Sequence, residues 1–115
     1  MRYLLLIHAD EQAWETASPE GREAMYAEYG KLMGEMQEQG HLVGGDELAP
    51  SATAKIVRLD DGVPQVVDGP YAETHEQLGG YFLVDCDLET ALGYAARIPS
   101  AAHGAIEVRA IADGP

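Results

Sequence analysis

Hydrophobic and polar positions at the start of the chain predict a buried strand. The run Tyr3–His8 is almost entirely apolar, which is typical of a strand covered on both faces. With a period of two, one face carries Leu4, Leu6 and His8, and the other carries Tyr3, Leu5 and Ile7. A polar connection over 9–17 follows and contains Trp14. We expect Trp14 to anchor this connection, with walling a pocket as the alternative.

Ser18 and Pro19 mark the start of a helix, because serine caps helix N-termini and proline suits the first helical position. Apolar residues then recur at helical spacing and predict one buried stripe, made of Met25, Tyr29, Leu32 and Met36. Gly40 supplies the stop signal. Gly30 and Gly34 each cost about 1 kcal/mol relative to alanine in a helix. We therefore expect them to permit a close approach to the sheet.

The rest of the chain predicts a strand at 41–43 and then a hairpin formed by 55–59 and 65–68. A strand at 80–85, a helix at 88–97 and a last strand at 106–110 follow. The hairpin turn is Asp60-Asp61-Gly62, since Asp-Gly suits turns that need positive φ. Asp87 caps the second helix and Pro99 follows its end. The apolar stripe expected on this helix comprises Ala91, Leu92, Ala95 and Ala96.

This order of elements is β-α-β, a hairpin, then β-α-β, and it predicts one α+β domain over residues 1–115. Two split β-α-β units indicate a ferredoxin-like sandwich, a sheet with both helices on one face. No further layer remains to cover the other face. We expect apolar pairs such as Leu4 with Leu6, or Phe82 with Val84, to lie there. A second copy of the chain would cover them, so the fold class predicted is a dimeric α+β barrel.

Charge restricts the possible partners. Seven Lys and Arg residues stand against twenty Asp and Glu residues, a formal net charge of −13. Nucleic acid and anionic membrane surfaces are therefore poor partners, because both are bound largely through basic side chains. A neutral or cationic small ligand, or a basic protein surface, remains open, and so does a role in solubility alone. The longest apolar opening is too short for a membrane span. The lone Cys86 favours a reducing compartment, so we expect a cytoplasmic protein.

The stretch DGPYAETHEQLGGYFLV, at 68–84, concentrates chemistry in one connection. An aspartate before a turn usually accepts a hydrogen bond from the backbone N–H two residues on, but here that residue is Pro70, which has none. Asp68 must therefore bond a later amide, at Tyr71 or Ala72, or contact a ligand, or do both. Gly69 precedes proline and is biased toward an extended shape. A second Asp-Gly-Pro at 113–115 has different flanks and is taken as coincidence.

Acid–base groups lie close together in this stretch. Glu73, His75 and Glu76 bracket an imidazole with carboxylates, which suits a general acid near neutral pH, although such groups on a loop are also often only solvated. His8 ends a buried strand, where pockets open, or it serves as a structural group. We expect Asp68, His75 and His8 as catalytic candidates. The candidates for substrate contact are Gly69, Pro70, Tyr71 and Glu73.

Other chemistries have less support. The four histidines are scattered without metal-ligand spacing, and we expect neither a metal nor another cofactor. There is no glycine-rich phosphate loop and no GxSxG nucleophile turn. Cys86 lies between Asp85 and Asp87, whose charge disfavours the thiolate, so it is a poor nucleophile.

The stretch 68–84 resembles the signature of the DGPF-domain proteins, a branch of the YCII-related group. Further similar segments extend over nearly the whole chain: YLLLIHADE at 3–11, AEYGKLMGEM at 27–36, AARIP at 95–99 and EVRAI at 107–111. The resemblance implies a ferredoxin-like fold that dimerises as an α+β barrel. Most members have no established activity. The wider group includes proteins thought to act on small, often aromatic or chlorinated, rings with a His–Asp pair, which does not map residue by residue onto this sequence.

Several positions depart from the pattern of that family. Tyr71 stands where Phe is usual, and His75 where Lys is usual. His8 stands where Tyr is common, and Ala110 where Pro is common. His75 would replace a catalytic lysine only while protonated.

Two functions follow as hypotheses. The first is a small-molecule binder or a proton-transfer enzyme, of isomerase or lyase type, acting on a small ring compound in a cleft at the dimer. The second is a non-catalytic regulatory partner. DGPF proteins are often encoded beside extracytoplasmic-function sigma factors, so the resemblance implies such an association, and the acidic charge suits a basic surface.

Overall fold

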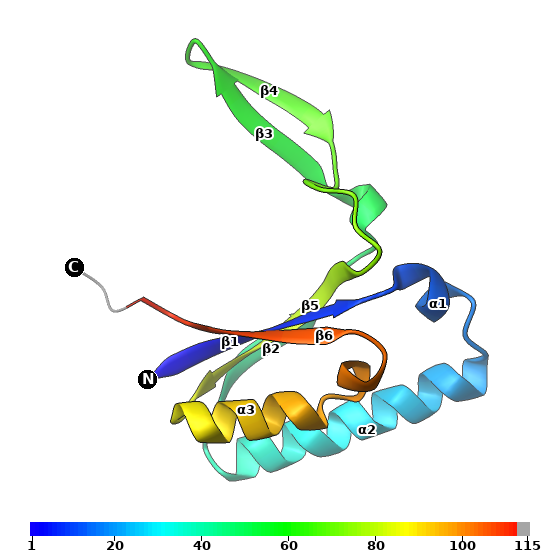
Figure 1. The fold of residues 1–115 in the computed structure, drawn as a ribbon, viewed down its shortest axis with the longest axis vertical. Coiled ribbons are helices and arrows are strands. Elements are labelled where there is room, and N and C mark those ends of the chain that lie inside the picture. The colour runs from blue at the N-terminus through cyan, green and yellow to red at the C-terminus, as the bar shows by residue number, and fades with distance from the viewer. Residues whose placement is uncertain (113–115) are drawn as a thin grey trace.

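A four-stranded antiparallel sheet is the centre of the computed structural model, which describes residues 1–112 (Figure 1). Its strands lie in the order β2-β5-β1-β6. Their bounds are Arg2–Ala9 for β1, Leu42–Glu47 for β2, Gln77–Asp85 for β5 and Ala105–Ala110 for β6. Neighbouring strands are all antiparallel. The second Asp-Gly-Pro, at 113–115, lies outside the described residues.

Two helices cover one face of this sheet, α2 (Pro19–Glu38) and α3 (Leu88–Arg97). Each begins with a side-chain cap. The Gly21 N–H donates to Ser18 Oγ at 3.0 Å, and the Thr90 N–H donates to Asp87 Oδ1 at 2.8 Å. These caps satisfy backbone donors that would otherwise lack partners at the helix starts. The order β1-α2-β2 and β5-α3-β6 confirms the α+β, ferredoxin-like fold.

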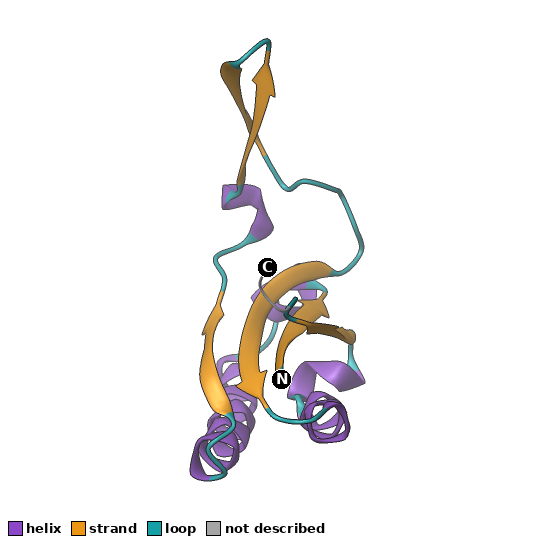
Figure 2. Ribbon diagram, turned by 90° about the vertical axis from the view of Figure 1, so that its left-hand side faces the viewer, coloured by secondary structure: helices purple, strands orange, loops and turns teal. Residues whose placement is uncertain are grey.

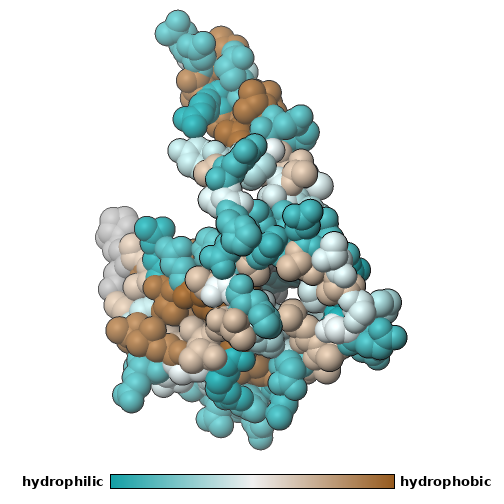
Figure 3. Space-filling view, turned by 45° about the vertical axis from the view of Figure 1, so that its right-hand side comes forward, coloured by the Kyte–Doolittle hydropathy of each residue, from teal (hydrophilic) through white to brown (hydrophobic). Residues whose placement is uncertain are grey.

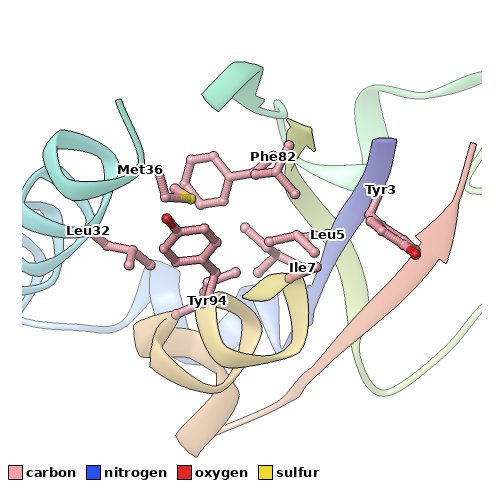
Figure 4. Packing of buried hydrophobic residues seen from close by; sticks show 10 residues of the cluster. Tyr3, Leu5, Ile7, Leu32, Met36, Phe82 and Tyr94 are labelled. Atoms are coloured by element: carbon pink, nitrogen blue, oxygen red, sulfur yellow. The ribbon is translucent and has the colours of Figure 1, made fainter. Parts of the chain in front are cut away.

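The core lies between the helices and the sheet, where side chains of α2 and α3 meet those of β1 and β5 (Figure 4). Leu5, Met36 and Val84 are fully buried there. The half-buried Met25 and Tyr29 complete the stripe expected on α2. Burying one such apolar side chain contributes roughly 1.5–3 kcal/mol, so this layer supplies most of the stability of the fold.

The register of β5 corrects the expected open face of the sheet. Phe82 and Val84 do not lie there: they pair with Leu5 and Tyr3 of β1 and are buried under the helices. Cross-strand partners share a face. The half-buried residues of the open face are therefore those paired with Leu4 and Leu6, giving the set Leu4, Leu6, Tyr81 and Leu83.

Two expectations about the helices were wrong. Leu92 and Ala96 are exposed, and Tyr94 is buried instead, with its hydroxyl 2.7 Å from His41 Nδ1. A polar partner for the hydroxyl explains how a tyrosine is accommodated in the core. Gly30 and Gly34 are exposed, and a Cβ on either would meet no atom within 4 Å, so they serve no close approach to the sheet.

The connection over 9–17 contains a short helix, α1 (Glu11–Glu15), that the sequence did not indicate. Trp14 anchors it, as expected. Its ring meets that of Tyr26 edge to face, with centroids 5.3 Å apart, and the Arg22 guanidinium lies 5.5 Å from its centroid. Arg22 also donates from Nε to the Trp14 carbonyl at 3.1 Å. These contacts fix the connection over 9–17 to α2.

The remaining two strands, β3 (Lys55–Asp60) and β4 (Val63–Asp68), form a separate two-stranded ribbon that we call the arm, residues 55–68. Its turn has positive φ at Asp61 (50°) and Gly62 (78°), as the Asp-Gly signal predicted. The arm projects away from the rest of the molecule (Figures 1 and 2). The Cα radius of gyration is accordingly 16.1 Å, above the roughly 13 Å of a compact chain of about 100 residues.

Two single turns complete the described chain, η1 (Ser51–Thr53) before the arm and η2 (Pro99–Ala102) before β6. Within residues 1–112, no helix has both the length and the apolar character needed to cross a membrane.

Candidate functional site

The Asp-Gly-Pro motif lies at the foot of the arm, where β4 ends. The Asp68 carboxylate is 78% exposed and pairs with Lys55 Nζ on the opposite strand. It bonds neither of the later amides considered from the sequence, because the cross-strand register places Lys55 directly opposite. Asp68 therefore pairs across the two strands at the foot of the arm, and because the pair is exposed to solvent it contributes little to stability.

Gly69 closes the arm against the segment that precedes it. Its N–H donates to the Ala54 carbonyl at 2.7 Å. A Cβ at position 69 would lie 2.8 Å from the Ala54 Cβ, so only glycine fits this approach. The peptide bond from Gly69 to Pro70 is cis. The two ends of the arm are thus held side by side.

A second anchor of the arm comes from α1. The Glu11 carboxylate accepts hydrogen bonds from the backbone N–H of Ser51 at 2.6 Å and from its Oγ at 2.7 Å. The Glu11 N–H in turn donates to Gln77 Oε1 at 2.9 Å, and Gln77 Nε2 donates to the Thr74 carbonyl at 2.6 Å. These bonds connect η1, α1 and the start of β5 into one framework around the foot of the arm.

Sequence reasoning missed Glu11 and Gln77. Forty residues separate Glu11 from Ser51, and neither position carries a motif. The one local signal was Asp10, whose side chain accepts from the Gln12 N–H at 3.0 Å and caps α1.

Between the foot of the arm and the end of the sheet lies a mainly apolar hollow of about 520 Å³, which we call the foot hollow. Ligand pockets of about 300–1,000 Å³ accommodate small molecules. Most of its wall consists of aliphatic residues from four segments of the chain: Leu48, Ala49, Pro50, Ala54, Ile56, Pro70, Ala72 and Leu78. Polar residues are the minority, and His8, Tyr71 and Glu76 are among them.

His8 is the imidazole at this hollow. The pairing of β1 with β5 shifts its register between Ile7 and His8. His8 pairs with Leu78 of β5 and with Ala105 of β6. Its Nε2 lies 3.3 Å from Glu107 Oε1, and the two side chains are 31% and 47% exposed. A carboxylate beside one ring nitrogen orients the imidazole and leaves the other nitrogen for a ligand.

Gly104 adds to the placement of His8. It packs against the His8 carbonyl so closely that a Cβ there would collide with the oxygen. The close packing fixes the backbone of His8 between β5 and the turn before β6.

A second, polar hollow of about 350 Å³ lies beside α1 and holds His75. Asp10, Glu11 and Glu15 line it together with Gln12, Thr74 and Gln77. Two of these carboxylates are already engaged, Asp10 in the helix cap and Glu11 at Ser51. Across residues 1–112, no group of three or more His, Cys, Asp or Glu residues is arranged to hold a metal ion.

The structure therefore divides the predicted site residues. His8, Pro70 and Tyr71 border the foot hollow, whereas His75 borders the polar hollow. Tyr71 is 76% exposed and lies against the arm, with the Arg58 guanidinium 5.5 Å from its ring centroid. The remaining three line neither hollow: Asp68 and Gly69 fix the foot of the arm, and Glu73 is exposed on the loop.

Cys86 behaves as expected from its neighbours. Burial raises the pKa of its thiol, and the charges of Asp87 and Asp85 raise it further. The thiolate is thus disfavoured near neutral pH.

Comparison with known proteins identifies the family. Residues 1–113 match the YCII-related domain. The chain belongs to the YCII-related family. This YCII-related protein is also similar to the uncharacterized protein R00369 of Rhizobium meliloti (strain 1021). The two are 35% identical over 115 residues, which cover 97% of this chain and 93% of the relative.

Proposed function

We propose that this YCII-related protein binds a small, mainly apolar ring compound in the foot hollow and transfers a proton at His8. The observation that carries the proposal is an imidazole, backed by Glu107, at the border of an aliphatic hollow of about 520 Å³. An aliphatic wall with few polar groups is the usual character of small-molecule sites.

Glu107 would orient the imidazole through Nε2, and Nδ1 would accept a proton from the compound and return it at another position. Such a step is an isomerisation, and loss of a leaving group in place of the return would make it an elimination. Tyr71 borders the hollow and is 76% exposed, and its ring would offer a stacking surface to the compound. Since the net charge is −13, the compound should be neutral or cationic.

Thermal melting with a panel of neutral, cationic and anionic aromatic compounds tests the proposal. A ligand at about ten times its Kd adds roughly 1.4 kcal/mol of stability, which raises Tm by about 5 °C in a domain of this size. We expect such a shift for neutral or cationic members with the wild-type protein, and its loss in His8→Gln.

His103→Gln is the matched control, because His103 is an exposed histidine that borders neither hollow. It should keep the shift. A panel in which no compound raises Tm, or in which His8→Gln responds as the wild type does, would refute the proposal. Exchange of substrate hydrogen with deuterated water then separates a catalyst from a binder.

The acidic charge favours a second candidate, a non-catalytic partner of a basic protein such as a sigma factor. Opposite charge steers such association and makes it sensitive to salt. Co-purification with a basic partner that is strong at low salt and lost at high salt would support this role. Elution without the partner at low salt would exclude it.

A further inference from the structure

Glu76 brings a carboxylate to the border of the foot hollow. Its half-buried side chain lines the hollow together with His8, Tyr71 and the aliphatic wall. Among the residues that the structure describes, no group donates a hydrogen bond to this carboxylate or forms an ion pair with it. Only the backbone carbonyl of Glu76 is engaged, as the acceptor for Thr74 Oγ1. The carboxylate is therefore available to a ligand.

The wall of the foot hollow holds no opposite charge for this carboxylate. Within residues 1–112, neither lysine nor arginine lines the hollow. The two basic residues of the arm have other partners: Lys55 forms an ion pair across the strands, and the Arg58 guanidinium lies 5.5 Å from the ring centroid of Tyr71. His8 is uncharged in the neutral form that accepts a proton. Glu76 therefore supplies the fixed charge that a compound in the hollow would meet.

The surroundings of Glu76 distinguish it from an ordinary surface acid. Hydrophilic side chains cover much of the face drawn in Figure 3, and hydrophobic ones gather along the arm and on part of the body. An acidic side chain on a hydrophilic surface keeps its water. At the mainly apolar foot hollow, in contrast, a compound that fills the space takes water away from Glu76. Removing water from a carboxylate is costly unless a cation or a hydrogen-bond donor replaces it.

We propose that Glu76 determines the substrate class of the hollow: a small ring compound that carries a protonated amine on a short side chain. The inference rests on the proposed function, which assigns the ring to the same hollow. The ammonium N–H groups would donate to the Glu76 carboxylate and replace the water that the ring displaces. A neutral ring of the same shape leaves the carboxylate without a partner, and an anionic one meets a like charge. The net charge of −13 adds long-range attraction for the same compounds.

The positions of His8 and Glu76 in the fold suit a compound of this size. His8 lies opposite Leu78 in the pairing of β1 with β5, and Glu76 precedes Leu78 by two residues. Two residues of chain span at most about 7 Å. The imidazole and the carboxylate thus border the same part of the aliphatic wall, to which Leu78 belongs. A single ring with a short side chain is long enough to reach both groups, with the ring beside His8 and the amine beside Glu76.

NMR titration with matched compounds tests this preference. A phenyl or a naphthyl ring carries in turn an aminomethyl group, which is cationic at neutral pH, a neutral hydroxymethyl group or an anionic carboxylate. The wild-type protein should bind the amine at least about tenfold more tightly than the alcohol, and the acid most weakly. The amine should also shift the backbone amide resonances at 76–78 more than the alcohol does. This second readout needs no variant.

Two charge-removing variants separate Glu76 from the net charge of the protein. Glu76→Gln keeps the shape of the side chain, and it should weaken binding of the amine about tenfold while the Kd of the alcohol stays within about threefold. Glu73→Gln is the matched control, because it removes the same charge from the same loop at an exposed position that borders neither hollow. It should bind the amine within about threefold of the wild type. Equal weakening by both variants would contradict the role of Glu76.

The outcomes also distinguish this inference from the proposed function. If amine and alcohol bind equally and both lose affinity in His8→Gln, the proposed function stands and the selection by charge is refuted. The preference for the amine should persist at about 0.5 M salt, because salt screens long-range attraction more than a contact pair, and its disappearance there would contradict the inference. If no member of either set binds, the inference falls, whatever the wider panel of aromatic compounds shows.

Discussion

The arm and the body of this protein use similar residues to opposite effect. Val84 in β5 is fully buried beneath two helices, whereas Val66 in β4 is 62% exposed on a ribbon that no layer covers within residues 1–112. Both residues favour a strand. The local preference for a strand is therefore shared, and the presence of a covering layer distinguishes the two regions. The body is stabilised by layers that pack on each other, whereas the arm is held by its own cross-strand pairing and by the hydrogen bond between Gly69 and Ala54.

The largest expected effect separates the two regions directly. Leu5→Ala removes a fully buried side chain from the core and should lower the free energy of unfolding by about 2–5 kcal/mol. Val63→Ala removes a 56% exposed side chain at the tip of the arm and should change it by less than about 0.5 kcal/mol. Urea denaturation at one protein concentration measures both. Comparable losses would mean that the tip of the arm is as well covered as the core.

An intermediate effect is expected where arm and body join. Glu11→Ala removes the acceptor of two hydrogen bonds from Ser51 and should destabilise the protein by roughly 1–2 kcal/mol. Amide exchange over 51–53 should also become faster. Glu15→Ala, which removes a carboxylate from the same short helix, is the control for charge and should be nearly neutral. If both variants behave alike, Glu11 does not anchor the arm.

The smallest effect concerns acid sensitivity of the body. The hydrogen bond from Thr90 lowers the pKa of the Asp87 carboxyl below its ordinary value. A lowered folded-state pKa gives stability that is present above the unfolded pKa and is lost as the pH falls through the folded pKa. The Tm of the wild type should therefore fall below about pH 4. The Tm of Asp87→Asn, which keeps a cap without the charge, should fall less over the same pH range. Identical melting profiles for the two proteins would refute this.

Local signals in the sequence predicted much of the fold. Ser18 with Pro19 marked the start of α2, and Asp87 marked that of α3, because caps act within three residues. The turn at Asp61 and Gly62 likewise fixed the hairpin, since positive φ is a local demand. Features decided by distant contacts were harder to predict. β2 continues to Glu47 through two glycines only because β5 pairs with it.

The candidate site was predicted in part, for the same reason. His8 at the end of β1 could be selected from its strand, and it borders the foot hollow. The sequence did not connect Glu107 with His8, although Glu107 Oε1 lies 3.3 Å from His8 Nε2, because ninety-nine positions separate the two residues. The division of the 68–84 stretch between two hollows was not predictable either. This division depends on how the loop after the arm folds back to β5, which places Pro70 and Tyr71 at the foot hollow and His75 at the polar hollow.

One hydrogen bond at the foot of the arm has a wider consequence. Since the Gly69 N–H donates to the Ala54 carbonyl at 2.7 Å, the two ends of the arm meet at practically one point. An insertion mounted in this way can be lengthened, shortened or exchanged without altering the strands that flank it. The surface that the arm presents can thus change while the four-stranded sheet beneath it keeps its pairing.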